Sequence, residues 1–287
     1  MKTETRLSVV RMCAVAGFSR ASYYRFLHPE KAAPADLDLR EEMQKIAVDW
    51  PSYGSRRMTQ ELKAQGWDVN RKRVQRLMRE DNLLCVRKRK FVVTTNSEHG
   101  LKVYPNLAAS LPVTGVDQLW VADITYIRLA EEFVYLAVIL DAYSRRVIGW
   151  HLDDSLQDSL TITALRRALC ARGVRAGLVH HSDRGVQYAS GDYTQFLKDN
   201  QVAISMSRKA SPWDNAACES FMKTLKYEEV YRTEYLNMAH ARQAIGEFLE
   251  TVYNEKRLHS ALDYRSPVQF ERALAGRAEP SGARASA

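Results

Sequence analysis

The residues of this chain best suited to chemistry are three carboxylates, Asp123, Asp183 and Glu219. Asp123 lies within the apolar run LWVADITYIRL, where a charge is costly unless it is paired or binds a metal. Asp183 follows a short predicted strand, and Glu219 lies on a predicted helix. Carboxylate oxygens favour Mg²⁺ or Mn²⁺ over zinc. If the three converge, two such ions roughly 3.5–4 Å apart would activate a nucleophile and stabilise the leaving oxygen in phosphoryl transfer.

The stretch HHSDRGVQY (180–188) suggests a different metal site, in which two histidines and one carboxylate bind one ion. His180 and His181 are adjacent on a predicted strand, so their side chains point to opposite faces and cannot share a metal. We therefore expect Asp183 to be the ligand and His181 to support it from behind. Structural alternatives stay open, because a single strand Asp is usually hydrogen-bonded and a helix Glu is usually a surface charge.

Basic residues accompany the third carboxylate. On a helical wheel Lys223 and Lys226 lie within about 40° of Glu219, while apolar residues occupy the opposite side. The loop SRKASPW (207–213) adds Arg208 and Lys209. This pattern is typical of a metal site approached by a nucleic-acid backbone, so we expect these four basic residues to contact DNA. Before the helix, Asp214 and Asn215 are expected to cap its first turn and to shape the approach of the helix that carries Glu219, and Cys218 is expected to pack rather than react.

The elements that must position these side chains form a mixed α/β sheet. Three apolar, β-rich runs separated by short polar turns predict an antiparallel meander, and the following segments alternate between helix and strand. The predicted strands cover 119–129, 132–144, 145–152, 177–184 and 202–207, and the predicted helices 159–172, 191–200 and 215–230. We therefore expect an α/β core with helices on both faces of the sheet.

Charge divides the chain unevenly. Residues 1–100 hold 20 Lys and Arg against 12 Asp and Glu, and the remaining residues hold 22 of each, so the net charge of +8 belongs to the first third. A basic module beside a neutral one indicates a polyanion-binding part and a separate working part. No apolar run is long enough to span a membrane, and the start of the chain lacks the features of a signal peptide. The four scattered cysteines predict neither a disulfide framework nor a zinc site, and a reducing cytoplasm is expected.

The basic first third predicts helix–turn–helix segments. One outline covers 7–27, and further helices are expected at 36–50, 55–65 and 71–81. In the last of these, Val74, Leu77 and Met78 share one face, and a basic stripe of Lys72, Arg76 and Arg79 lies opposite. This stripe fits a recognition helix that contacts phosphates, although a solvated charged face is the commoner outcome. The domains expected along the chain are a helix–turn–helix-like segment (1–30), a helix–turn–helix DNA-binding domain (36–92), a linker (93–115), a catalytic core (116–232), a helical extension (233–275) and a disordered tail (276–287).

The motifs resemble a known family. WVADITYI, HHSDRGVQY and SPWDNAACESFMKTLKYE are similar to the three catalytic motifs of DDE transposases related to retroviral integrases, and more narrowly to those of OrfB-type insertion-sequence transposases. There are 59 residues between Asp123 and Asp183, and 35 between Asp183 and Glu219. The second interval matches the D-x35-E spacing of that family, and Lys226 matches its usual basic position. Segments 53–80 and 253–270 extend the resemblance, which covers about residues 7–272.

The resemblance implies an RNase H-like integrase core in which Asp123, Asp183 and Glu219 hold two Mg²⁺ ions, with Mn²⁺ able to substitute. It implies no protein nucleophile: water and then a DNA 3′-OH would attack, exposing a 3′-OH at a transposon end and joining it to a target phosphodiester. For this subgroup it also implies copying out through a branched, circularised intermediate. Retroviral integrases carry an N-terminal His/Cys zinc module that this chain lacks, so no zinc is expected.

The implied partners are the terminal inverted repeats, target DNA and further copies of the chain on DNA, with an upstream reading-frame product or a frameshift fusion supplying additional parts. The implied location is the bacterial cytoplasm, at the nucleoid, with no membrane. Two other functions remain open. One is an RNase H-like nuclease that only hydrolyses, and the other is a catalytically silent DNA-binding regulator of the element.

Overall fold

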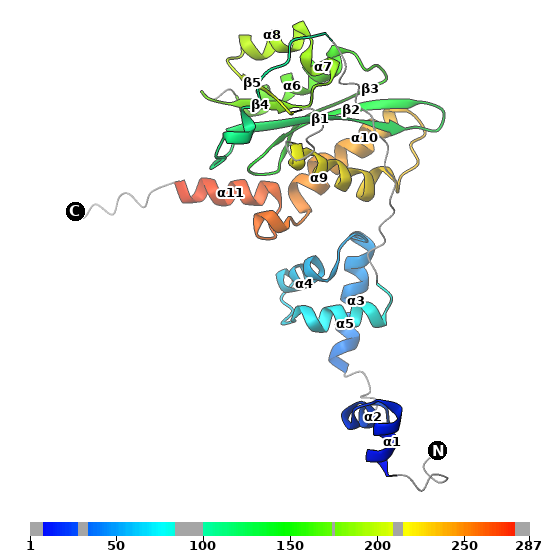
Figure 1. Ribbon diagram of the computed structural model, residues 1–287. Helices are drawn as coiled ribbons and strands as arrows, with labels where there is room; N and C mark the ends of the chain where they lie inside the picture. Colours follow the sequence, from blue (N-terminus) through cyan, green and yellow to red (C-terminus); the bar gives the residue numbers. More distant parts are fainter. Residues whose placement is uncertain (1–7, 28–33, 84–99, 174–175, 209–214, 279–287) are drawn as a thin grey trace, which may run out of the picture. The chain divides into compact units, whose positions relative to one another are not determined.

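The computed structural model describes residues 8–27, 34–83, 100–173, 176–208 and 215–278. Contacts divide the chain into two compact units, Met1–Cys85 and Val86–Ala287, and each is described by itself (Figure 1). None of the described helices is both long and apolar enough to cross a membrane.

The first unit is all α-helical. Its helices are α1 (Val9–Ala16), α2 (Arg20–Leu27), α3 (Pro34–Asp49), α4 (Ser55–Ala64) and α5 (Arg71–Glu80). Their ends follow local chemistry. Ser8 begins α1 by accepting a hydrogen bond from the Arg11 N–H, and Gly17 ends it in the left-handed conformation, with φ of 69°, which glycine adopts without strain. Asn70 caps α5 in the same way as Ser8, accepting from the Arg73 N–H.

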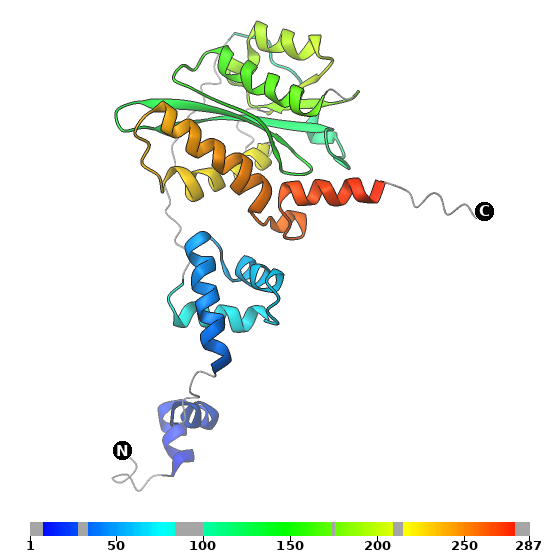
Figure 2. The same ribbon diagram turned by 180° about the vertical axis from the view of Figure 1, so that it is seen from behind.

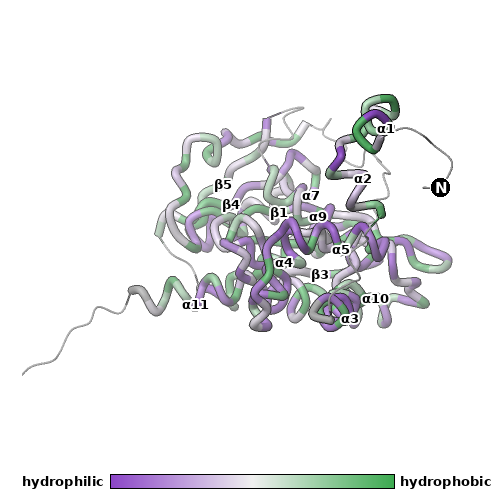
Figure 3. Tube along the Cα trace, turned by 90° about the horizontal axis from the view of Figure 1, so that it is seen from below, coloured by the Kyte–Doolittle hydropathy of each residue, from purple (hydrophilic) through white to green (hydrophobic). Residues whose placement is uncertain are grey.

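Helices α3, α4 and α5 share a small apolar core and an ionic tie. Their packed faces bury side chains completely, among them Leu39, Met43, Met58, Leu62, Val74 and Leu77. Asp36 at the start of α3 accepts a hydrogen bond from Arg73 of α5, with Oδ1 and Nη2 2.6 Å apart. That hydrogen bond is the main reason why the pKa of Asp36 lies below its ordinary value. Hydrophilic residues cover the other sides of α4 and α5 (Figure 3).

The second unit is built on a five-stranded sheet in the order β3-β2-β1-β4-β5. Strands β1 and β2 pair antiparallel, as do β2 and β3, whereas β4 is parallel to both β1 and β5. This is the predicted mixed sheet with its antiparallel meander. The strands are β1 (Leu119–Arg128), β2 (Phe133–Asp141), β3 (Val147–Asp153), β4 (Val179–Ser182) and β5 (Ala203–Met206).

Helices cover both faces of the sheet (Figures 1 and 2). One face packs against α6 (Asp158–Arg172), α7 (Val186–Ala189) and α8 (Gly191–Asp199). The other packs against α9 (Ala216–Leu225), which continues as a π-helix over Lys226–Val230, and α10 (Met238–Glu247), which continues as a π-helix over Phe248–Lys256. At Gly149 of β3, a Cβ atom would lie 2.4 Å from the carbonyl oxygen of Ala164. Only glycine therefore lets α6 approach the sheet so closely.

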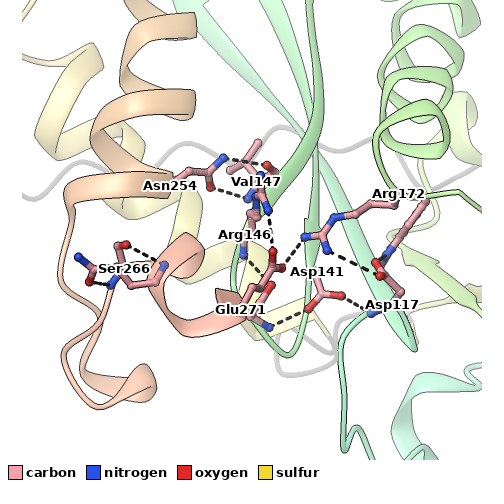
Figure 4. A network of polar contacts seen from close by, with 11 residues as sticks. Asp117, Asp141, Arg146, Val147, Arg172, Asn254, Ser266 and Glu271 are labelled. Atoms are coloured by element: carbon pink, nitrogen blue, oxygen red, sulfur yellow. Dashed lines mark hydrogen bonds and ion pairs between the residues drawn. The ribbon is translucent and has the colours of Figure 1, made fainter. Parts of the chain in front are cut away.

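Helix α11 (Pro267–Ala278) is tied to the sheet by ion pairs (Figure 4). Glu271 Oε2 lies 2.6 Å from Arg146 Nη1, and its other oxygen pairs with Arg172 of α6. Arg172 also lies 3.6 Å from Asp117, whose backbone N–H donates to Asp141. Burial alone would raise the pKa of Glu271, but the hydrogen bonds from the two arginines lower it below its ordinary value.

Two boundaries differ from the predicted ones. Helix α11 runs to Ala278, so residues 276–278, expected in the disordered tail, are helical, and the helix that begins at Pro267 continues through Gly276. Within the predicted linker, part of the segment from Gly100 packs on the core: the Ser205 Oγ of β5 accepts hydrogen bonds from the N–H groups of Leu107 and Ala108. The remainder of the tail, 279–287, and residues 93–99 lie outside the described residues.

Candidate active site

Asp123 lies on β1 at the point where β4 stops pairing with it. The pairing of β1 with β4 runs from Leu119 to Val121, whereas the pairing with β2 continues to Arg128. Alternate residues of a strand direct their N–H and C=O groups to the same neighbour. The Gln118 carbonyl accepts from the Val179 N–H at the start of β4, so the backbone groups of residues 122 and 124 face that same edge.

Two side chains form hydrogen bonds with the backbone groups along this unpaired edge of β1. The Ala122 carbonyl accepts a hydrogen bond from Asn215 Nδ2 at 3.1 Å. The Ile124 N–H donates to Oδ1 of Asp123 at 2.9 Å. The carboxylate of Asp123 therefore lies along the strand edge, on the side where β4 has ended.

Asp183 lies directly after β4 and is held by its own turn. The N–H of Gly185 donates to Asp183 Oδ1 at 2.8 Å. A Cβ atom on Gly185 would lie 3.0 Å from that oxygen, so a larger residue would press on the carboxylate. Since β4 is parallel to β1, Asp183 leaves the sheet in the direction in which Asp123 lies along β1.

The three carboxylates and one lysine share an electrostatic environment. Burial, together with the charges of Asp183 and Glu219, raises the pKa of Asp123 to about 7, although the Ile124 N–H and Lys226 oppose the shift. Charges affect one another in this way only over short separations. The folded chain thus brings residues from β1, the end of β4 and α9 into one neighbourhood.

Glu219 forms an ion pair with a lysine of its own helix. Its Oε1 lies 2.7 Å from Lys223 Nζ, one turn further along α9, and both side chains are largely exposed. Within the described part of the chain, no three acidic, histidine or cysteine side chains stand close enough together to hold a metal ion. A site with all three ligands therefore requires Glu219 to turn away from Lys223.

The two histidines of HHSD have separate partners. His180 Nε2 lies 2.9 Å from the Tyr193 hydroxyl, and burial lowers its pKa to about 3, so it is neutral. His181 lies between two serines, with Nδ1 2.8 Å from Ser205 Oγ and Nε2 3.0 Å from Ser207 Oγ. The rings point to different sides, as expected for adjacent strand residues.

The tautomer of His181 follows from its neighbours. Ser205 Oγ already accepts two backbone N–H groups, so its single proton is directed to Nδ1 of His181. Nε2 of His181 then carries the ring proton and donates to Ser207. The His181 ring thus links β4 to Ser205 of β5 and to Ser207 just after it, and both ring nitrogens take part in these hydrogen bonds.

The basic residues of the core differ in their surroundings. Lys226 is half-buried, and burial lowers its pKa while the charge of Asp123 opposes the shift. Lys223 is exposed and paired with Glu219. Arg208 is exposed after β5, and Lys209 lies outside the described residues.

The predicted basic stripe is exposed on α5 in the first unit. Lys72, Arg76 and Arg79 are exposed, while the apolar face of the helix is buried. Arg76 is partly neutralised, since its guanidinium lies 3.5 Å from Asp36 and 3.7 Å from Glu80.

The expected role of Asn215 as a helix cap is wrong. In α9 it makes no side-chain capping hydrogen bond, and its amide instead reaches Ala122 of β1. An Asn before a helix is a strong capping pattern, but nothing in the order of residues reveals a strand edge that competes for its amide. Asp214 lies outside the described residues. Cys218 is fully buried, and burial raises the pKa of its thiol, which agrees with a packed residue.

Known protein families match segments of both units. Family models described as an integrase core domain match residues 113–212 and 200–267, and one described as an HTH-like domain matches residues 34–91. Among solved structures, the magnesium complex of the HTLV-2 integrase catalytic core domain is 18% identical, with a TM-score of 0.43, and covers 54% of this chain and 95% of that one.

Two curated relatives are similar over nearly the whole chain. An uncharacterized 31 kDa protein of insertion element IS600 from Shigella sonnei is 40% identical, over 90% of this chain and 97% of the relative. The transposase InsF for insertion sequence IS3A from Escherichia coli K12 is 34% identical, over 94% of this chain and 96% of the relative. With this extent of identity and an integrase core that carries the three acidic motifs, the chain belongs to the OrfB-type insertion-sequence transposases of the DDE superfamily.

Proposed function

We propose that this transposase cuts DNA at transposon ends to expose a 3′-OH and then joins that hydroxyl to a phosphodiester of target DNA. The observation that carries the proposal is the environment of Asp123. Burial and the charges of Asp183 and Glu219 together raise its pKa to about 7. Three carboxylates from β1, the end of β4 and α9 suit phosphoryl transfer with divalent cations once Glu219 turns toward the other two.

Asp123, Asp183 and Glu219 would hold two divalent cations, with Mg²⁺ expected and Mn²⁺ able to substitute. The residues fit such ions because a hard cation takes oxygen ligands and offsets the repulsion between neighbouring carboxylates. An exposed ion pair one helical turn apart is worth only about 0.3–0.5 kcal/mol, so Glu219 can leave Lys223 at little cost. When bound, the ions would supply an activated nucleophile and stabilise the leaving oxygen.

The lysines of α9 would act on DNA rather than on the ions. Lys226, which is half-buried and whose charge interacts with Asp123, would contact the scissile phosphate. Lys223, once released from Glu219, would contact a neighbouring phosphate. Both act as fixed positive charges in a partly dehydrated site, where they are worth more than in water.

Further DNA contacts would come from two other places. Lys72, Arg76 and Arg79 on α5 are expected to contact phosphates of the terminal inverted repeats, and Arg208 with Lys209 to contact DNA beside the core. We further propose that several copies assemble on the two transposon ends and target DNA, with an upstream reading-frame product or frameshift fusion adding parts. The proposed location is the bacterial nucleoid.

A joining assay with a labelled transposon end, target DNA and Mg²⁺ separates the candidate functions. Joined products support the transposase, cleavage without joining supports a nuclease that only hydrolyses, and a shifted DNA band without either supports a silent regulator. The gathered acidic residues argue against the silent regulator, since DNA binding alone has no use for them.

Glu219→Gln sharpens the assay. We expect this variant to lose both cleavage and joining and to keep its affinity for transposon-end DNA, because the amide removes a negative ligand and little else. Glu255→Gln makes the same change at an exposed glutamate and is expected to join like the unaltered chain. Joining by Glu219→Gln at an unaltered rate would overturn the assignment.

A further inference from the structure

Beyond Val121, strand β1, which carries Asp123, no longer has β4 as a hydrogen-bonding partner along one edge. Because β4 pairs with β1 only as far as Val121, the next carbonyl on that edge, from Ala122, must find another donor or remain unsatisfied. The donor is Nδ2 of Asn215, at 3.1 Å. A single side chain therefore continues the edge pairing of the sheet at the residue next to Asp123.

Asn215 is also the residue from which α9 starts. Helix α9 begins at Ala216, and Glu219 follows Asn215 by four residues, about one turn of helix. The same hydrogen bond thus joins the strand of one carboxylate to the helix of another. It fixes the start of α9 directly against the backbone of β1.

The amide also hydrogen-bonds the Cys218 thiol in the first turn of α9, but it does not cap the backbone N–H groups of that turn. A capping Asn accepts hydrogen bonds through its oxygen from the N–H groups of the first turn, as Asn237 does for α10. Asn215 makes no such bond, and its Oδ1 is buried without a hydrogen-bond partner among the described residues. A buried acceptor left unpaired is unfavourable, so the side chain is held in this position by the bond to β1 rather than by capping.

We propose that Asn215 is a positioning residue for the acidic site: its amide holds α9 against β1 so that Glu219 can reach ions bound by Asp123. The inference rests on the proposed function, because it concerns the metal site assigned there. Residues that orient metal ligands commonly change metal affinity by about 10–100-fold when they are replaced.

Asn215→Ser distinguishes a residue that holds α9 against β1 from a residue that caps α9. Serine caps a helix about as well as asparagine and adds no charge, but it is too short to reach Ala122 from the start of α9. We expect Asn215→Ser and Asn215→Ala both to weaken Mn²⁺ binding by the full-length chain, measured by electron paramagnetic resonance without DNA, by roughly tenfold. If Asn215 were a cap, Asn215→Ser would bind Mn²⁺ like the unaltered chain, and that result would overturn the inference.

Two further variants make the outcome specific. Asn237→Ala removes a true cap from α10 and is expected to lower the melting temperature while leaving the affinity for Mn²⁺ unchanged. Asp123→Asn tests the metal site itself: if it left Mn²⁺ binding unaltered, the proposed function would fail before Asn215 was in question. If Asp123→Asn weakened binding, and Asn215→Ser melted like the unaltered chain and bound Mn²⁺ equally well, only the role of Asn215 would be lost.

Discussion

Glu219 Oε1 lies 2.7 Å from Lys223 Nζ on the same face of α9. The third carboxylate of the acidic site is thus paired with a lysine one turn along its own helix, while Asp123 lies on β1 and Asp183 follows the end of β4. In the proposed two-metal site, a divalent cation would therefore have to compete with the Lys223 ammonium for the Glu219 carboxylate.

Lys223→Gln should shift that competition. Because exposed pairs of this kind are worth about 0.3–0.5 kcal/mol, we expect the Mg²⁺ concentration that gives half-maximal cleavage to fall by about twofold. Lys223→Arg keeps both the charge and the pair, and should leave this concentration unchanged. A higher Mg²⁺ requirement in Lys223→Gln would show that the lysine assists metal binding instead of competing with it.

The buried pairs of Glu271 should make folding depend on acidity. Since its folded pKa lies below its ordinary value of 4.5, its contribution to stability is present above about pH 4.5 and is lost as the pH falls through the folded pKa. Glu271→Gln removes the acidic partner of Arg146 and one of the two acidic partners of Arg172, which keeps Asp117. We expect it to lower the free energy of unfolding at pH 7 by about 2–3 kcal/mol, discounted because Arg146 is 37% exposed.

Urea unfolding at several pH values measures both effects. The unaltered chain should lose more stability below pH 4.5 than Glu271→Gln does, so the two curves converge at low pH. Parallel curves would mean that Glu271 does not contribute through its charge. Glu255→Gln, at an exposed position, should be indistinguishable from the unaltered chain.

If the basic stripe on α5 contacts DNA phosphates, it should contribute to the salt dependence of DNA affinity. Each phosphate contact that is lost reduces the slope of log affinity against log salt by about one. We expect Arg79→Ala to show this change with transposon-end DNA, and Lys63→Ala, at an exposed cation that lies on α4 and does not belong to the stripe, to show none. An unaltered slope for Arg79→Ala, Lys72→Ala and their combination would make the stripe a solvated face.

Much of the fold could be predicted because its signals are local. Apolar, β-rich runs separated by polar turns predicted the β1–β2–β3 meander, and the apolar spacing of Val74, Leu77 and Met78 predicted the buried face of α5. The acidic residues stood out because Asp123 interrupts an apolar strand. Such features depend on neighbours in sequence, where side-chain periodicity is readable.

The remaining features depend on contacts between distant segments. The amide of Asn215 is claimed by Ala122, 93 residues away, and Ser205 holds the backbone of Leu107, 98 residues away, so part of a predicted linker belongs to the core. The pairing of Glu219 with Lys223 is local, and the helical wheel placed both on one face. A wheel cannot tell whether such a lysine serves DNA or its neighbouring carboxylate.

The central claim is that the acidic residues join a DNA 3′-OH to target DNA, and one experiment tests it most directly. A labelled transposon end already cut to its terminal 3′-OH is incubated with target DNA, Mg²⁺ and either the unaltered chain or Asp123→Asn, beside an identical end that carries a 3′-deoxy terminus. We predict joined products only with the 3′-OH end and the unaltered chain, and equal DNA binding by both proteins. Joining by Asp123→Asn, or of the 3′-deoxy end, would contradict the account.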